Sequence, residues 1–139
     1  MKVLVRKNSK KWNDFEIKEW EKADLEHYGR KVNWDKKDFN IVVKENNKIV
    51  GSLRMYIRVG ICYIDSVIVS SELRGRGIGK ILMDKAEELA KKNKVHKIYF
   101  HTGKDWDFVN FYEGLGYKIT SDLPNHYLRV HFVEMTKFI

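Results

Sequence analysis

Hydrophobic side chains recur along this chain at two spacings, one typical of strands and one typical of helices. Apolar residues alternate with other residues, or form short β-branched runs, over residues 2–6, 39–44, 49–58, 61–70, 95–101, 117–120 and 126–138. Apolar positions three and four residues apart predict a helix over residues 78–93, and a shorter one is expected over residues 105–114. Residues 10–28 also have helical character, but their irregular spacing favours a break into two helices.

Small and polar residues mark the ends of these elements. Ser9 is suited to cap the first helix, and Gly29 is suited to end it. The polar segment over residues 45–48 predicts a hairpin turn, and residues 59–60 predict a second turn. The segment between residues 39 and 70 is therefore expected to be an antiparallel meander of three strands.

A helix separates the strand at residues 61–70 from the strand at residues 95–101. Two strands joined in this way are expected to be parallel, through a right-handed crossover. The whole pattern predicts an α+β fold in one domain over residues 1–139, with a mixed, mostly antiparallel sheet of about seven strands and about four helices.

The most informative segment covers residues 67–80, where a β-branched strand leads through a glycine-rich turn into a helix. Glycines allow backbone N–H groups to converge, and the positive end of the helix dipole points to the same place, so the segment is suited to hold phosphate. Its glycines, Gly75, Gly77 and Gly79, do not have the dinucleotide spacing, and Ile81 stands where a Walker A loop needs Ser or Thr.

Two motifs resemble those of the GNAT superfamily of N-acetyltransferases. Arg74-x-x-Gly77-x-Gly79 resembles the loop that binds the pyrophosphate of acyl-CoA in that family. The run over residues 111–117 resembles the Phe-Tyr-x-x-x-Gly-(Phe/Tyr) signature that follows the second core helix of the family. One helix and one strand separate the two motifs, as in the family. The chain departs from many relatives at Asp105 and Phe108, where those have Asn and Ala.

The resemblance implies that acetyl-CoA is the co-substrate and that pantetheine lies between two strands that splay apart at a bulge. Backbone groups of the first strand would pair with pantetheine, the glycine loop would hold the pyrophosphate, and a carboxylate would accept a hydrogen bond from the pantetheine chain. The residues so implied are Val67, Ile68, Val69, Arg74, Gly75, Arg76, Gly77, Ile78, Gly79, Lys80 and Asp105. No metal is expected, because no His residue has ligand spacing with Cys or carboxylates.

Acetyl transfer to an amine needs a base for the amine and a proton for the leaving thiolate. Tyr112 is the predicted proton donor, with Phe111 packing inward, although Tyr112 could instead be a core tyrosine. Asp65 and His101 are alternative candidates for the base, and His101 could equally be a plain strand-end residue. Strand alternation predicts that Asp65 shares a face with Val67 and Val69.

Charge, cysteine content and the length of apolar runs narrow the possible functions and locations of the protein. The net charge of +8 is compatible with nucleic-acid binding, but residues 14–26 contain six acidic and two basic side chains, so the charge is divided between regions. The single cysteine, Cys62, excludes an internal disulfide and agrees with a reducing compartment. No apolar run has the length of a signal peptide or a membrane span, so a cytoplasmic protein without membrane association is expected.

The leading hypothesis is therefore acetyl transfer from acetyl-CoA to a primary amine by direct attack, on a small cationic molecule or a peptide. A longer acyl-CoA as donor is one alternative, and a CoA-binding sensor without turnover is another. A nucleic-acid binder that uses Trp12, Trp20 and Trp34 is disfavoured, because its aromatic residues are not interleaved with lysines on one stretch. A homodimer and the identity of the acceptor stay open.

Overall fold

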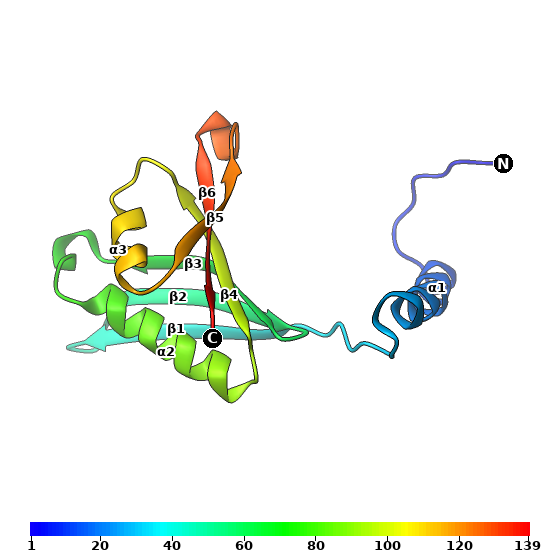
Figure 1. Ribbon diagram of the computed structural model, residues 1–139, viewed down its shortest axis with the longest axis horizontal. Coiled ribbons are helices and arrows are strands. Elements are labelled where there is room, and N and C mark those ends of the chain that lie inside the picture. The colour runs from blue at the N-terminus through cyan, green and yellow to red at the C-terminus, as the bar shows by residue number, and fades with distance from the viewer. The chain divides into compact units, whose positions relative to one another are not determined.

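The computed structural model describes all 139 residues, which divide into two compact units, Met1–Trp34 and Asp35–Ile139 (Figure 1). The first unit contains one continuous helix, α1 (Lys10–Tyr28). Its caps are as predicted: the Ser9 hydroxyl accepts a hydrogen bond from the Trp12 N–H at 3.3 Å, and Gly29 has a left-handed φ of 67°. The expected break is wrong, because residues 10–28 contain no proline or glycine to interrupt the helix.

The expected strand at residues 2–6 is also wrong, because these residues form no regular element and their side chains are exposed. Alternation alone does not make a strand, since its backbone groups need a paired neighbour and none is present. Near the end of the unit, the Trp34 Nε1–H donates to the buried Asp24 carboxylate at 2.9 Å. Asp24 therefore has a structural role within this unit.

The second unit contains a six-stranded sheet in the order β1-β2-β3-β4-β6-β5. Its strands are β1 (Lys37–Glu45), β2 (Lys48–Arg58), β3 (Ile61–Val69), β4 (Lys97–Gly103), β5 (Lys118–Leu123) and β6 (Phe132–Phe138). Only β3 and β4 are parallel, and every other neighbouring pair is antiparallel. The predicted fold class and the parallel crossover are confirmed, whereas six strands replace the expected seven.

Two helices complete this unit, α2 (Ile78–Lys92) and α3 (Phe108–Gly114), so the chain has three α-helices instead of four. Single-turn 3₁₀ helices occur at η1 (Ser71–Leu73) and η2 (Tyr127–Arg129). The predicted final strand begins six residues late, at Phe132, because Leu128 and Arg129 have φ values of 52° and 65°, which no strand accommodates.

The predicted turns are present. Asn46 and Asn47 connect β1 to β2 with φ values of 50° and 64°, as expected of a primed hairpin turn. Val59 and Gly60, with φ values of 48° and 78°, connect β2 to β3 in the same way. These turns fix the register of the meander and therefore the faces of its side chains.

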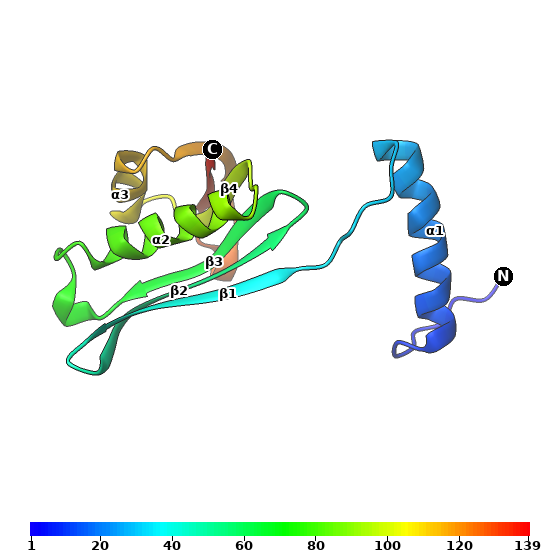
Figure 2. The ribbon, with the colours of Figure 1, turned by 90° about the horizontal axis from the view of Figure 1, so that it is seen from below.

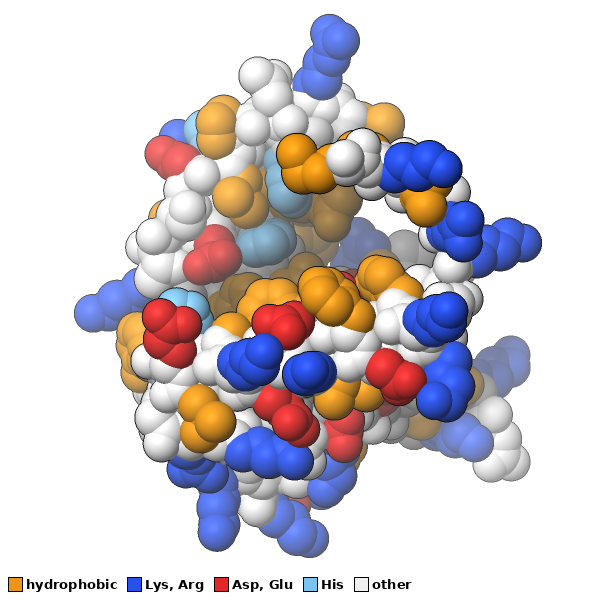
Figure 3. All heavy atoms as spheres, turned by 90° about the vertical axis from the view of Figure 1, so that its right-hand side faces the viewer, with side chains coloured by type: hydrophobic (Ala, Val, Ile, Leu, Met, Phe, Trp, Pro, Cys, Tyr) orange, Lys and Arg blue, Asp and Glu red, His pale blue; other side chains and the backbone are white.

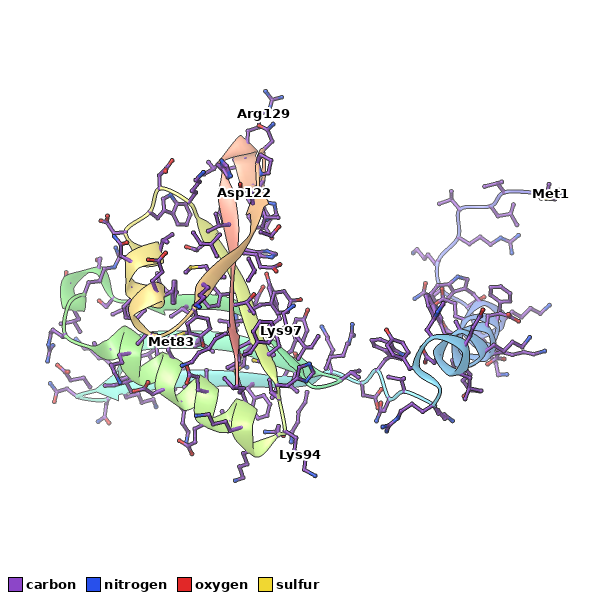
Figure 4. The ribbon with its side chains drawn as sticks, viewed as in Figure 1. Met1, Met83, Lys94, Lys97, Asp122 and Arg129 are labelled. Atoms are coloured by element: carbon purple, nitrogen blue, oxygen red, sulfur yellow. The ribbon has the colours of Figure 1, made fainter.

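The main core lies between the sheet and the two helices. Figure 2 shows α2 along one side of β1, β2 and β3, and α2 contacts all three strands, while α3 contacts β4. The apolar stripe of α2 is buried as its periodicity predicts, at Ile78, Leu82, Met83, Ala86 and Ala90. In Figure 4 the labelled Met83 marks this stripe. Burial of the stripe fixes α2, and with it the glycine loop that precedes the helix.

Surface charge is mixed, and no helix is long and apolar enough to cross a membrane. Acidic and basic side chains lie side by side on the face of the molecule shown in Figure 3. Four ion pairs of the structure join neighbours on one helix, among them Lys10 with Asp14 and Lys85 with Glu88. Exposed pairs of this kind contribute little stability, so they describe a solvated surface.

Candidate functional site

The parallel pair of strands splays apart. β3 pairs with β4 at three positions only, from Ile61 opposite Lys97 to Tyr63 opposite Tyr99. Beyond Tyr63, β3 continues to Val69 and β4 to Gly103 without pairing with each other, although β4 remains paired with β6. The splay is therefore confirmed, and it leaves backbone groups on both strands free to bind a ligand.

A bulge in β3 accompanies the splay. Met55 of β2 pairs with Ile64, but the next residue of β2, Arg54, pairs with Ser66, so Asp65 is an extra residue. The bulge interrupts the alternation, and the prediction that Asp65 shares a face with Val67 and Val69 is wrong. Val67 and Val69 pack against the core, whereas the Asp65 carboxylate lies 3.5 Å from the guanidinium of the exposed Arg54.

A cleft of about 600 Å³ opens at the splay. It brings together most of the predicted residues, because its walls include Asp65, Val67, Ile68, Val69, Arg74, Gly75, Gly77, Ile78, Gly79, Lys80, His101 and Tyr112. Two predicted residues do not line it. Arg76 forms a two-pronged ion pair with Glu45, at 3.3 and 3.2 Å, and Asp105 is exposed outside the cleft.

Sequence reasoning missed an aromatic wall of the cleft, formed by Trp106, Phe108 and Phe111. These three rings are 47%, 45% and 37% exposed, so together they present an apolar surface to the cleft. Their clustering within six residues, shortly after a strand, is the signal that could have identified them. Apolar rings at this position can contact the non-polar part of an elongated ligand.

The glycine loop forms part of the cleft wall. Gly75 and Gly77 have φ values of 79° and 82°, and a Cβ at either position would meet no atom within 4 Å. Glycine is therefore needed there for its backbone conformation and for close approach by a ligand. The N–H groups from Gly75 to Lys80 donate no backbone hydrogen bonds within the protein. They are free to bind an anion, with the positive end of the α2 dipole behind them.

Two of the three cationic side chains of this loop are in ion pairs, and the third is not. The Lys80 ammonium is paired with Asp84 one turn further along α2, and Arg76 is held by Glu45. Arg74 is exposed and forms no ion pair. It is the cleft-lining cation that a phosphate can engage without breaking an existing contact.

Tyr112 lines the cleft and is largely buried. Its ring packs 4.4 Å from the Phe100 ring, the residue is only 8% exposed, and its hydroxyl forms no hydrogen bond within the protein. Burial raises the pKa of Tyr112 to about 12. The expectation that Phe111 packs inward is wrong, because Phe111 lies at the cleft wall, where a Cβ on Gly79 would be 3.3 Å from its ring.

His101 lines the cleft from β4, and its partner is the residue directly opposite on β6. The His101 Nε2 lies 3.2 Å from Oε2 of Glu134, and the two side chains are 21% and 24% exposed. The ring of His101 also packs 5.7 Å from that of Tyr63. Each candidate base therefore has a charged partner, Arg54 for Asp65 and Glu134 for His101.

No group of three or more His, Cys, Asp or Glu side chains lies close enough to hold a metal ion. Burial raises the pKa of the Cys62 thiol to about 12, so the thiol stays protonated and inert at neutral pH. The three predicted catalytic side chains, Tyr112, His101 and Asp65, all line the cleft.

A splayed parallel pair of strands, a loop with free backbone N–H groups and an apolar wall thus line one cleft. The chain belongs to the GNAT family of acetyltransferases, since residues 9–117 match the sequence model described as Acetyltransferase (GNAT) family. A curated acetyltransferase of Agrobacterium fabrum is 32% identical over 84 residues, which are 60% of this chain and 61% of that relative.

Solved structures agree in fold. An acetyltransferase from Bacillus cereus superposes with a TM-score of 0.76 at 17% identity, covering 99% of this chain and 98% of that one. A GNAT family acetyltransferase from Elizabethkingia anophelis, solved with acetyl-CoA bound, has a TM-score of 0.68 at 20% identity and covers 72% of this chain and 75% of that one. At these identities the likeness establishes the fold of this chain.

Proposed function

We propose that this protein transfers the acetyl group of acetyl-CoA to a primary amine by direct attack. The observation that carries the proposal is the cleft at the splay, which joins free backbone groups of β3 to the free N–H groups of the glycine loop. In this reading the loop from Gly75 to Lys80 holds the pyrophosphate with Arg74. The backbone from Val67 to Val69 then pairs with pantetheine as an added strand would.

The proposed reaction uses one group as the base for the amine and another as the proton donor for the leaving thiolate. His101 or Asp65 takes a proton from the acceptor ammonium, which frees the nitrogen lone pair to attack the thioester carbonyl. Tyr112 donates to the sulfur as the carbon–sulfur bond breaks. Its raised pKa keeps the proton on its oxygen at neutral pH, and no protein group competes for its hydroxyl.

Fold alone does not select the acceptor. Structures similar to this chain include an aminoglycoside 6'-N-acetyltransferase complexed with coenzyme A and a ribosomal-protein-S18-alanine N-acetyltransferase from Escherichia coli. One fold thus serves a small cationic molecule and a protein. We propose a primary amine as the common chemistry, in a cytoplasmic enzyme that needs neither nucleic acid nor membrane.

Thermal unfolding with and without acetyl-CoA tests the binding part of the proposal. Ligand at about 100 times its Kd adds about 2.7 kcal/mol to the unfolding free energy, which raises the melting temperature by several degrees. Gly77→Glu should abolish the shift, because its carboxylate would face the pyrophosphate. Gly29→Glu is the matched control, since Gly29 also has a left-handed φ, of 67°, with no atom within 4 Å of a Cβ.

Thiol release measured against a panel of amines tests turnover. Release that rises with an added primary amine supports the enzyme. Binding of acetyl-CoA without amine-dependent release would identify a CoA sensor instead, and release only from longer acyl-CoA donors would correct the donor. An unchanged melting temperature at millimolar acetyl-CoA would overturn the proposal altogether.

A further inference from the structure

His101 and Glu134 form a hydrogen-bonded pair at the edge of the splay. They stand directly opposite each other in the antiparallel β4–β6 pairing, with His101 Nε2 and Glu134 Oε2 3.2 Å apart. The second carboxylate oxygen, Oε1, accepts a hydrogen bond from the Thr120 hydroxyl of β5 at 3.3 Å. Glu134 is therefore held by two neighbours and has little freedom to turn away from His101.

This contact decides which nitrogen of His101 carries the proton. An ionised carboxylate only accepts hydrogen bonds, so a neutral His101 must carry its proton on Nε2. The lone pair then lies on Nδ1. No protein group forms a hydrogen bond with Nδ1, and His101 lines the cleft from β4. The pair thus leaves one basic nitrogen available at the place where the two strands separate.

Three other rings lie around His101, and none of them forms a hydrogen bond with it. The rings of Tyr63 on β3, Tyr99 on β4 and His126 beyond β5 lie 5.7, 6.2 and 5.6 Å from the His101 ring. Burial raises the pKa of Tyr63 to about 12 and also raises that of Tyr99, so both phenols are neutral at working pH. Glu134 is the one carboxylate that is hydrogen-bonded to His101.

We infer that Glu134 is a positioning residue that holds His101 as the Nε2–H tautomer and so makes Nδ1 the general base. This inference rests on the proposed function and selects His101 over Asp65 as the base. Asp65 is the extra residue of the bulge, its carboxylate forms an ion pair with Arg54, and its side chain is 54% exposed.

The proton balance of the reaction follows from these assignments. The acceptor ammonium gives one proton to Nδ1 of His101, which passes it to solvent. The neutral nitrogen attacks the acetyl carbonyl, a carbon–nitrogen bond forms, and the carbon–sulfur bond breaks. The sulfur takes the Tyr112 proton, and the second proton that leaves the nitrogen restores Tyr112. Glu134 itself exchanges no proton, and it stabilises the imidazolium while it exists.

A double-mutant cycle with Glu134→Gln and His101→Ala tests the inference. Glutamine keeps the size of the side chain and can accept from Thr120, but it can also donate to Nε2, which releases the tautomer. Glu134→Gln should lower kcat by roughly tenfold or more, up to the full contribution of about 10²–10⁴-fold that a general base makes, with acetyl-CoA affinity unchanged. In the His101→Ala background the same change should have no further effect. Losses that multiply would overturn the inference.

Asp122→Asn is the matched control. Asp122, labelled in Figure 4, pairs with His131 Nε2 at 3.2 Å in the same two-stranded region, but neither residue lines the cleft. This variant should keep the parent's kcat. Glu134→Asp, which keeps the charge and shortens the reach, should fall between the parent and Glu134→Gln.

Nitrogen-15 NMR of the imidazole rings gives a readout that needs no turnover. The parent should show His101 protonated on Nε2 at neutral pH, and Glu134→Gln should show a mixture of tautomers. A His101 protonated on Nδ1 in the parent would overturn the inference even in an active enzyme. An Nε2–H tautomer in a protein that transfers no acetyl group would instead contradict the proposed function.

Discussion

Replacing Tyr112 by Phe separates catalysis from folding, because it removes one hydroxyl and almost nothing else. The ring keeps its packing 4.4 Å from Phe100. The lost hydroxyl has no hydrogen bond within the protein, so the free energy of unfolding should change by less than about 1 kcal/mol. Turnover should fall by about 10²–10⁴-fold, which corresponds to about 3–5 kcal/mol of barrier. The cleft keeps its shape, and acetyl-CoA affinity should be retained.

Tyr117→Phe is the matched control, for which we expect lower stability and unchanged turnover. Tyr117 is 1% exposed, and its hydroxyl donates to Oε1 of Glu87 at 3.3 Å, outside the cleft. Loss of this hydrogen bond should lower the unfolding free energy by about 0.5–1.5 kcal/mol. Turnover at a temperature where the protein is folded should match that of the parent.

The two variants are compared by urea unfolding and by single-turnover thiol release, which excludes product release as the limiting step. Tyr112→Phe should lose activity and keep its stability, whereas Tyr117→Phe should lose stability and keep its activity. A Tyr112→Phe enzyme with the parent's rate would show that Tyr112 is a core residue. A rate that falls only in proportion to the folded fraction would lead to the same conclusion.

Three further predictions concern stability and the cleft wall. Burial raises the pKa of the Cys62 thiol from 9.0 to about 12, so above pH 9 the folded state keeps a proton that the unfolded state loses. The free energy of unfolding should therefore keep the contribution of this thiol below pH 9 and lose it as the pH rises toward 12. Urea midpoints measured across this pH range test the prediction. Gly103→Ala would place a Cβ 2.3 Å from the Trp106 ring, so the ring must move, and both a loss of about 1–3 kcal/mol and weaker acetyl-CoA binding are expected by calorimetry. Asp24→Ala should leave the Trp34 indole N–H without its partner at 2.9 Å, and hydrogen exchange of that N–H should quicken at least tenfold.

The elements that could be predicted from sequence are those whose cause is local. Asn46 and Asn47 adopt positive φ with little strain, Ser9 caps a helix with its own hydroxyl, and the stripe along α2 follows its 3.6-residue period. Residues 2–6 show the limit of this reasoning. Their alternation is real, but a strand is stabilised by a paired neighbour, and sequence alone does not say whether one is available.

The candidate site divides in the same way. The glycine loop could be predicted from sequence because Gly75 and Gly77 adopt a positive φ that favours glycine, and both glycines are visible in the motif. The pairing of His101 with Glu134 could not be predicted, since the two residues are 33 positions apart and only the register of β4 against β6 brings them together. The ion pair of Arg76 with Glu45 could not be predicted either, because it depends on where the β1–β2 turn lies relative to the glycine loop.

The bulge at Asp65 connects the fold to the chemistry. Before it, Ile64 faces the core and Tyr63 faces the opposite side of the sheet, where its ring meets those of Tyr99 and His101. After it, Val67 returns to the core side, although a regular strand would have placed it opposite. One extra residue therefore bends β3 where its pairing with β4 ends, and it turns a carboxylate to the face that carries His101. In the proposed reaction, pantetheine pairs with the backbone of β3, and the acceptor amine approaches from the face of the sheet that carries Asp65 and His101.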